Sequence, residues 1–251
     1  PIQVAERLFQ VIERLAENGP MGIMDLSAEL GFHKSTTHRL VTSLQYMGYI
    51  RQDEESLKYA LSLKFLEIGS KILEQTNMAS LIHPSLKKLS EQTGETVHLV
   101  RREGTEAVYI DKVESTVSSI RMVSRVGSRI PLYCSGVGKA LLAELPDPEI
   151  EDIWNSSEIT SLTPYTVTSL SDLMDRIRGV REAGYAMDDE ENEEGVRCIA
   201  VSIPDYHKEP VYALSISAPV SRMTDARIAE LSTDVLTFKK DLEKTLGFSR
   251  S

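Results

Sequence analysis

The side chains best suited to bind another molecule near the start of the chain lie between residues 32 and 51. At 100° per residue, one face of a helix over this stretch carries Ser35, His38, Arg39 and Thr42. The opposite face consists of Thr37, Leu40, Leu44 and Met47 and is expected to pack in a core. In a major groove, Arg binds guanine edges and hydroxyl groups bind bases or phosphates. Because residues 32–51 contain no acid, the polar face predicts a DNA-reading helix, to which Lys34 and Thr36 contribute.

The neighbouring segments predict the frame that holds this helix. Residues 23–30 carry apolar side chains at helical spacing, and Gly31 permits the sharp turn between the two helices. A third helix is expected from residue 4 to residue 15. Beyond the reading helix, two short strand-like segments flank the polar loop 53–56 and predict a hairpin. Three helices followed by a hairpin form a winged helix-turn-helix, although a small helical bundle without DNA-binding function has a similar glycine and polar face.

The charge of the chain is acidic overall but basic in this stretch. The 251 residues carry 28 Lys and Arg against 38 Asp and Glu, a net charge of −10. In contrast, Lys34, Arg39 and Arg51 make residues 32–51 basic. This distribution argues against a protein that coats phosphate backbones without sequence preference, and it fits a local reading surface on an acidic body. Arg51 and Lys58, on the predicted hairpin, are expected to reach phosphates unless they are only solvated surface charges.

Cysteine usage and hydropathy indicate the compartment. Cys134 and Cys198 lie far apart in the sequence and form no CxxC or zinc-binding spacing, which favours a reducing environment. No apolar run has the length of a membrane span, and the first residues do not have the character of a signal peptide. We therefore expect a cytoplasmic protein.

The chain is expected to divide into a DNA-binding domain over residues 1–60, a linker or dimerisation helix over 61–77, and an effector-binding domain over 78–251. The linker has a wide apolar sector, which either buries a second copy of the chain or packs on the following domain. Within that domain, helices are expected over 81–93, 137–145, 170–183 and 225–246. Strands are expected over 96–102, 107–114, 119–124, 196–203 and 211–217, with a loop over 125–133. This order predicts an α+β domain with an antiparallel sheet and packed helices.

The whole chain resembles the IclR family of bacterial transcriptional regulators. The resemblance rests on residues 34–40 in the reading helix, on Gly127–Tyr133 and Gly136–Ala143, and on Asp188–Glu191, Gly195–Ala200 and Leu214–Ser217. It implies a winged-helix domain, a linker helix and a GAF-like effector domain, assembled as dimers or dimers of dimers. Residues 121–133 and 193–198 are most similar to the regulators of 2-keto-3-deoxygluconate and pectin catabolism within the family.

The resemblance also implies which residues line the effector site: Met122, Ile130, Gly136, Val137, Asp188, Cys198, Ser215 and Ser217. Gly136 opens a helix, where backbone N–H groups and the helix dipole favour a carboxylate. Ser215 and Ser217 are two apart on a strand, so both hydroxyls face one side. Since an ionised Asp188 repels a bound carboxylate, its expected role is to accept a hydrogen bond from a ligand hydroxyl. The alternative to a ligand site is that the glycine-rich segment is only a tight turn and that the serines form hydrogen bonds only with the backbone.

Two other functions are weighed against a ligand-responsive regulator. A DNA-binding redox or metal sensor would use Cys134, Cys198 and His98, although no metal-ligand spacing joins them. An enzyme is disfavoured because the P-loop-like segment 135–140 has Ala140 where a magnesium-binding hydroxyl is required. The sequence thus predicts a transcriptional regulator, with repression preferred over activation. Its expected partners are operator DNA, a small organic acid such as a keto-sugar acid, and further copies of the same chain. No catalytic residue, metal or cofactor is expected.

Overall fold

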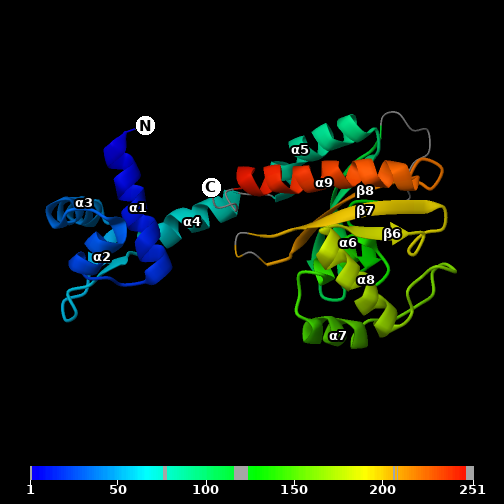
Figure 1. The fold of residues 1–251 in the computed structure, drawn as a ribbon, viewed down its shortest axis with the longest axis horizontal. Coiled ribbons are helices and arrows are strands. Elements are labelled where there is room, and N and C mark those ends of the chain that lie inside the picture. Colours follow the sequence, from blue (N-terminus) through cyan, green and yellow to red (C-terminus); the bar gives the residue numbers. More distant parts are fainter. Residues whose placement is uncertain (1, 76–77, 116–123, 206, 208, 247–251) are drawn as a thin grey trace. The chain divides into compact units, whose positions relative to one another are not determined.

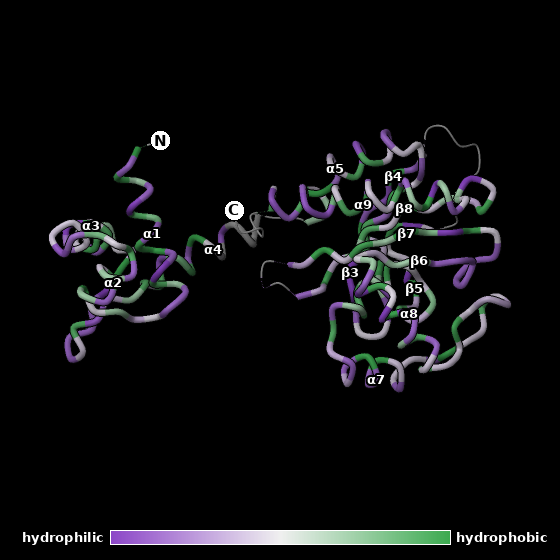
Figure 2. The backbone as a smooth tube through the Cα atoms, viewed as in Figure 1, coloured by the Kyte–Doolittle hydropathy of each residue, from purple (hydrophilic) through white to green (hydrophobic). Residues whose placement is uncertain are grey.

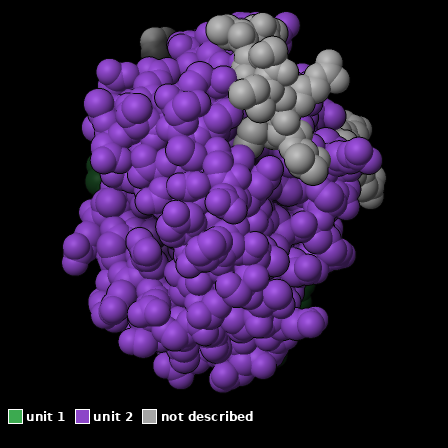
Figure 3. All heavy atoms as spheres, turned by 90° about the vertical axis from the view of Figure 1, so that its right-hand side faces the viewer, with its two compact units in different colours: residues 1–77 green, residues 78–251 purple. Residues whose placement is uncertain are grey.

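The computed structural model describes residues 2–75, 78–115, 124–205, 207 and 209–246. They form two compact units, unit 1 up to Asn77 and unit 2 from Met78 (Figures 1 and 3). Each unit has its own buried cores. In unit 2 the apolar stretches follow the central strands, whereas polar residues dominate the outer loops (Figure 2). Within the described residues no helix is long and apolar enough to cross a membrane.

Unit 1 is a winged helix-turn-helix. Its elements are α1 (Gln3–Asn18), α2 (Ile23–Leu30), α3 (Lys34–Tyr46), β1 (Ile50–Gln52), β2 (Tyr59–Leu61) and α4 (Lys64–Gln75). Gly31 ends α2 in the left-handed conformation with φ 65°, and this glycine makes the sharp turn into α3. β1 and β2 pair antiparallel as the wing. Val11, Leu26, Leu44 and their neighbours bury the inner faces of the three helices.

The core side of α3 differs from the prediction at its end. Thr37, Leu40 and Leu44 are buried as expected, together with Val41. Met47, however, is 41% exposed, so its placement in the core was wrong. The reason is that α3 ends at Tyr46 with Met47 as its C-cap, and the left-handed Gly48, with φ 79°, then turns the chain away from the helical path. The core face is therefore one turn shorter than the sequence spacing indicated.

Unit 2 is built on an antiparallel sheet with the strand order β5-β4-β3-β8-β7-β6. The strands are β3 (Thr96–Glu103), β4 (Glu106–Val113), β5 (Arg129–Pro131), β6 (Ala186–Asp189), β7 (Val196–Ile203) and β8 (Tyr212–Pro219). The sequence-distant strands β3 and β8 pair at the centre, with His98 opposite Ser215. The predicted α+β class and antiparallel sheet are therefore confirmed.

Helices cover both faces of this sheet (Figure 1). α5 (Met78–Thr93) and α9 (Asp225–Thr245) lie over one face, where they pack on Leu99, Val201 and other large residues. α6 (Gly136–Leu142) and α8 (Leu170–Ala183) lie over the other, and α7 (Asp147–Asn155) follows α6. The face below α6 carries small residues at Ala186, Ala200 and Ala213. Small side chains at these positions allow α6 to lie close to the sheet.

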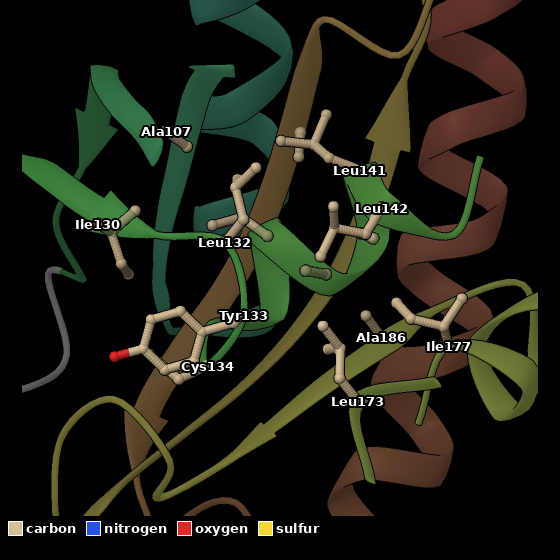
Figure 4. Close-up of a cluster of buried hydrophobic side chains, with 14 of the residues drawn as sticks. Ala107, Ile130, Leu132, Tyr133, Cys134, Leu141, Leu142, Leu173, Ile177 and Ala186 are labelled. Carbon is tan, nitrogen blue, oxygen red and sulfur yellow. The ribbon is translucent and has the colours of Figure 1, made fainter. Parts of the chain in front are cut away.

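The contact between α6 and the segment before it is unusually close. Leu132 lies near Leu141 and Leu142 of α6 in the same buried cluster (Figure 4). An ideal Cβ added to Gly138 would lie 2.1 Å from the backbone oxygen of Leu132, inside any permissible contact. Only glycine fits there, so this residue sets how closely α6 approaches the chain that leads into it.

Three elements of unit 2 depart from the prediction. The expected loop 125–133 contains β5, and neither α7 nor β6 was predicted. β5 and β6 are edge strands of three and four residues, too short to show a clear alternation of apolar and polar side chains. Residues 119–123 of the expected strand 119–124 lie outside the described residues.

Candidate functional site

The outer face of α3 presents the predicted DNA-contacting side chains to solvent. Lys34, Ser35, His38, Arg39 and Thr42 are exposed and Thr36 is half-buried. His33 Nδ1 lies 2.9 Å from the hydroxyl of Ser35, and His38 Nδ1 lies 3.5 Å from that of Thr42. Within the described residues, no acidic side chain pairs with Lys34 or Arg39. Both cations are therefore available to an external anion or base edge.

The wing carries its two basic residues beside an acidic tip. Arg51 is exposed on β1 and Lys58 is exposed just before β2, while Asp53, Glu54 and Glu55 occupy the turn between the strands. Asp53 accepts hydrogen bonds from the hydroxyl and the backbone N–H of Ser56, and these bonds lower the pKa of its carboxyl. The acidic tip of the wing is unfavourable for a phosphate, whereas Arg51 and Lys58 beside it carry positive charge.

A cavity opens on the α6 face of the sheet, and its polar groups come from segments far apart in the sequence. Its empty space, including the part open to solvent, is about 420 Å³. Its lining comprises His98, Tyr109, Ser124, Ile130, Ser135, Gly136, Val137, Asp188, Asn192, Glu193, Val196, Cys198, Ser215 and Ser217.

The strand register explains why these side chains meet. Ser217 pairs with Cys198, and Cys198 pairs with Asp188, so the three form one row across β8, β7 and β6. His98 and Ser215 form the start of the adjacent row on β3 and β8. Alternation along each strand turns both rows to the same face of the sheet. α6 begins above them, which places its first residues against this polar surface.

His98 is the hydrogen-bonding centre of the cavity. Its Nδ1 lies 3.4 Å from the hydroxyl of Ser215 and 3.3 Å from that of Ser217, and its Nε2 lies 2.7 Å from that of Ser124. Burial, with a smaller contribution from the charge of Lys112, lowers the pKa of His98 to about 3. The imidazole is therefore neutral near pH 7, and one of its nitrogens accepts while the other donates.

Asp188 is buried, although it belongs to an acidic segment that the sequence suggests is exposed. Its Oδ1 accepts hydrogen bonds from the backbone N–H groups of Glu191 at 2.8 Å and Asn192 at 3.3 Å. Burial nevertheless raises the pKa of Asp188 to about 7. The sequence led us to expect most of the run 188–194 on a solvated face, but Asp188 and Glu191 are both buried.

The first turn of α6 contributes free backbone donors. Ser135 caps the helix by accepting a hydrogen bond from the Gly138 N–H at 3.1 Å, and it donates one to the Pro131 carbonyl. Among the described residues, nothing accepts a hydrogen bond from the N–H of Gly136 or Val137. An added Cβ on Gly136 would lie 3.4 Å from the backbone nitrogen of Asp188, so the two walls of the cavity nearly touch here.

The structure brings together seven of the eight predicted effector-site residues, and the eighth, Met122, lies outside the described residues. Sequence reasoning missed Tyr109, Ser124, Ser135, Asn192, Glu193 and Val196. It considered His98 as part of a metal, redox or cysteine-enzyme site and did not place it among the effector-binding residues. Alternation along β3 places His98 on the face of Val100, a signal that the strand pattern contains. Its meeting with two serines of β8 depends on a pairing that no local pattern reveals.

The alternative of a thiol or metal sensor finds little support in this geometry. Burial raises the pKa of Cys134 to about 12 and raises that of Cys198 as well. Since the thiolate is the reactive form, both thiols are poor nucleophiles near pH 7. In the part of the chain that the structure describes, no three His, Cys, Asp or Glu side chains are grouped to hold a metal ion.

Comparison with known proteins agrees with this architecture. Residues 4–54 match the model of the IclR helix-turn-helix domain, and residues 70–243 match that of the bacterial transcriptional regulator IclR C-terminal domain. The acetate operon repressor of Salmonella typhimurium is 36% identical over 99% of this chain and 92% of its own length. The regulator KdgR of Escherichia coli is 35% identical over 96% and 92%, respectively. The crystal structure of Thermotoga maritima IclR, 31% identical, matches with a TM-score of 0.65 over 98% of this chain and 100% of that one.

Both units thus match the domains of a regulator, and the sequence relatives are regulators rather than enzymes. The helix-turn-helix of unit 1 is the DNA-binding part. The chain therefore belongs to the IclR family of bacterial transcriptional regulators.

Proposed function

We propose that the cavity of unit 2 binds a small organic acid and that this acid controls the binding of operator DNA by unit 1. The observation that carries the proposal is that Gly136 and Val137, whose N–H groups have no acceptor among the described residues, line a cavity that also contains serine hydroxyls. Helix N–H groups and hydroxyls hold a carboxylate without a cation. Ile130 and Val137 supply an apolar wall, and Asp188 is placed to accept a hydrogen bond from a ligand hydroxyl.

The chemistry of the cavity favours a hydroxylated or 2-oxo acid. An acid with a carboxylate at one end and oxygen substituents beside it would use the α6 donors and the hydroxyls together. The acetate operon repressor and KdgR are nearly equally similar to the chain, at 36% and 35% identity, so this comparison does not favour the ligand of one relative over that of the other. We retain short 2-oxo acids and keto-sugar acids as the two classes to test.

Replacing Ser215 with alanine tests the proposed cavity. We expect the affinity for the acid to fall about two- to tenfold, since one neutral hydrogen bond contributes about 0.5–1.5 kcal/mol. Operator binding without acid should not change. The assay is a thermal-shift and calorimetric screen of short 2-oxo and keto-sugar acids on the full chain. Ser202→Ala is the matched control, because Ser202 is a buried serine of the same sheet whose hydroxyl bonds to Glu144 instead. Equal affinities for wild type and Ser215→Ala would place the ligand elsewhere.

The acid should bind more weakly as the pH rises through about 7. The pKa of Asp188 is about 7, so its carboxyl is mostly neutral below that pH and mostly ionised above it. Because the ionised form repels an anionic ligand, binding above pH 7 must take up a proton, with a loss of up to about tenfold in affinity per pH unit. Asp188→Asn should flatten this dependence and keep the affinity seen at low pH. Titration calorimetry from pH 6 to pH 8.5 measures it, and an affinity that rises with pH would contradict this role for Asp188.

We also propose that unit 1 reads DNA as a pair of heads. α3 would enter a major groove, with Arg51 and Lys58 of the wing on phosphates, and two heads would contact half-sites about 34 Å apart. Exposed apolar side chains on unit 1 support pairing: Val4 and Phe9 on α1 are 59% and 62% exposed, and Leu66 on α4 is 69% exposed. Unit 1 up to residue 60 would then be the reading domain and residues 61–77 the dimerising linker, in a dimer or dimer of dimers. Repression is the expected outcome, as in the relatives named repressors.

A further inference from the structure

One wall of the cavity is the turn that joins β6 to β7. Asn192 and Glu193 of this turn line the cavity directly. Glu190 adopts the left-handed region with φ 62°, which is uncommon for a residue with a Cβ. A turn in this conformation persists only where its surroundings hold it. The contacts that hold the turn therefore decide the shape of the cavity.

Hydrogen bonds from two threonines and to Asp188 fix the backbone of this turn. The hydroxyl of Thr163 donates to the carbonyl of Glu190 at 2.7 Å, and that of Thr166 donates to the carbonyl of Glu191 at 2.6 Å. The Glu191 N–H donates to Asp188, as described above. These bonds fix the turn to the loop before α8, but none of them connects it to α6.

Besides the close approach of Gly136 to Asp188, a buried ion pair connects this turn to α6. Lys139 Nζ lies 2.5 Å from Glu191 Oε1, and both side chains are only 2% exposed. The second carboxylate oxygen of Glu191 has no hydrogen-bond partner among the described residues. Removing two charges from water is costly, and apolar side chains of similar volume would fill the space at least as favourably. Packing alone therefore does not explain the pair.

The position of the pair points to its role. Lys139 lies on α6 within one turn of Gly136 and Val137, which line the cavity. Glu191 lies between Asp188 and the lining residues Asn192 and Glu193. The pair thus joins the two elements that carry opposite sides of the proposed acid site. Hydrogen-bond geometry tolerates only a few tenths of an ångström, so the spacing of these elements affects affinity.

We propose that Lys139 and Glu191 are a positioning pair that fixes the 188–193 wall of the cavity at the distance from α6 that an acid ligand requires. The part of this inference that concerns affinity rests on the proposed acid-binding function. The part that concerns the position of the wall does not, because it applies to the protein without ligand. Neither residue lines the cavity, so both act through the residues that do.

The test uses the full chain with both members of the pair replaced, Lys139→Met with Glu191→Leu. Replacing both avoids the isolated buried charge that either single substitution would leave. We expect a melting temperature near that of wild type and unchanged operator affinity without acid. Hydrogen exchange of a peptide covering residues 188–195 should become at least about tenfold faster, and the affinity for pyruvate and for 2-keto-3-deoxygluconate should fall at least about tenfold.

A matched control is the double variant Lys239→Met with Glu144→Leu. Lys239 Nζ and Glu144 Oε1 form an ion pair at 3.2 Å in the same unit, and neither residue lines the cavity. Its loss should leave exchange at 188–195 and both acid affinities unchanged. If the Lys139/Glu191 variant does not fold, Lys139→Leu with Glu191→Gln removes the same ion pair and keeps a side chain of nearly the same shape at position 191, with the same expected direction.

The outcomes separate this inference from the proposed function. Wild-type exchange at 188–195 in whichever of the two Lys139/Glu191 double variants folds would overturn the positioning role. Faster exchange with unchanged acid affinity would overturn its effect on binding. If neither acid binds wild type, the choice of acid fails, and exchange at 188–195 still decides whether the pair positions the wall.

Discussion

The Gly138→Ala variant is expected to melt roughly 6–12 °C or more below wild type, or not to fold. The added Cβ would lie 2.1 Å from the Leu132 oxygen and 2.3 Å from its Cα, and both are backbone atoms. No side-chain rotation relieves such a contact, so α6 or the segment 131–135 must move. Overpacking of this kind costs about 3 kcal/mol or more, and a unit of this size loses roughly 2–4 °C per kcal/mol.

Gly179→Ala is the matched control for this substitution. Gly179 lies inside α8 of the same unit, and an added Cβ would meet no atom within 4 Å. Since alanine favours a helix more than glycine does, this variant should be as stable as wild type or slightly more so. Calorimetric melting of the three proteins decides the matter. A Gly138→Ala protein that melts within about 2 °C of wild type would show that α6 does not approach Leu132 as closely as described.

The Arg39→Ala variant is expected to bind operator DNA about 10- to 100-fold more weakly than wild type. Arg39 is exposed in the middle of the outer face of α3, and no acidic residue pairs with it in the described part of the chain. A bidentate contact between Arg and guanine provides about 1–3 kcal/mol of discrimination. Because the side chain lies outside the core of unit 1, the helical content and melting temperature should not change.

The measurement is fluorescence anisotropy on an operator selected from a random library with the wild-type protein. Arg178→Ala is the matched control, because it removes the same charge from a 63% exposed side chain on α8. It should bind the operator like wild type at a fixed salt concentration. If Arg39→Ala and Arg178→Ala bind equally well, α3 does not read the DNA through this residue.

Local signals were enough to predict most of unit 1. Gly31 punctuates two helices with clear apolar spacing, and the polar loop 53–56 sits between two strand-like segments. The long elements of unit 2 were predictable for the same reason, since β7 and α8 begin and end at the residues that the sequence pattern indicates. Met47 was placed wrongly because periodicity alone does not determine where a helix ends.

The features that the sequence did not predict depend on contacts between segments far apart in the chain. The sequence suggests that Asp188 and Glu191 lie on a solvated surface, because all four residues from 188 to 191 are acidic. Their burial depends on α6, which begins more than 50 positions earlier in the chain. One local signal was present: Lys139 stands alone among apolar and small residues between Gly136 and Ala143. A charged residue in such a run has to find a buried partner.

The side chains gathered around the cavity also depend on pairing over long distances. His98 and Ser215 are opposite one another across β3 and β8, although 117 positions separate them in the sequence. Period-two alternation tells which face each residue occupies, but it does not tell which strands are neighbours. Family resemblance named seven of the residues that line the cavity, while the hydrogen-bonding role of His98 emerged only from the fold.

A small acid in unit 2 and operator DNA on unit 1 are expected to be thermodynamically coupled. The most direct test is a closed cycle in wild type, in which operator affinity is measured with and without the acid and acid affinity with and without operator. We predict that each ligand changes the affinity for the other by the same factor, about 5- to 150-fold. An acid that binds the cavity but leaves operator affinity unchanged would contradict the account.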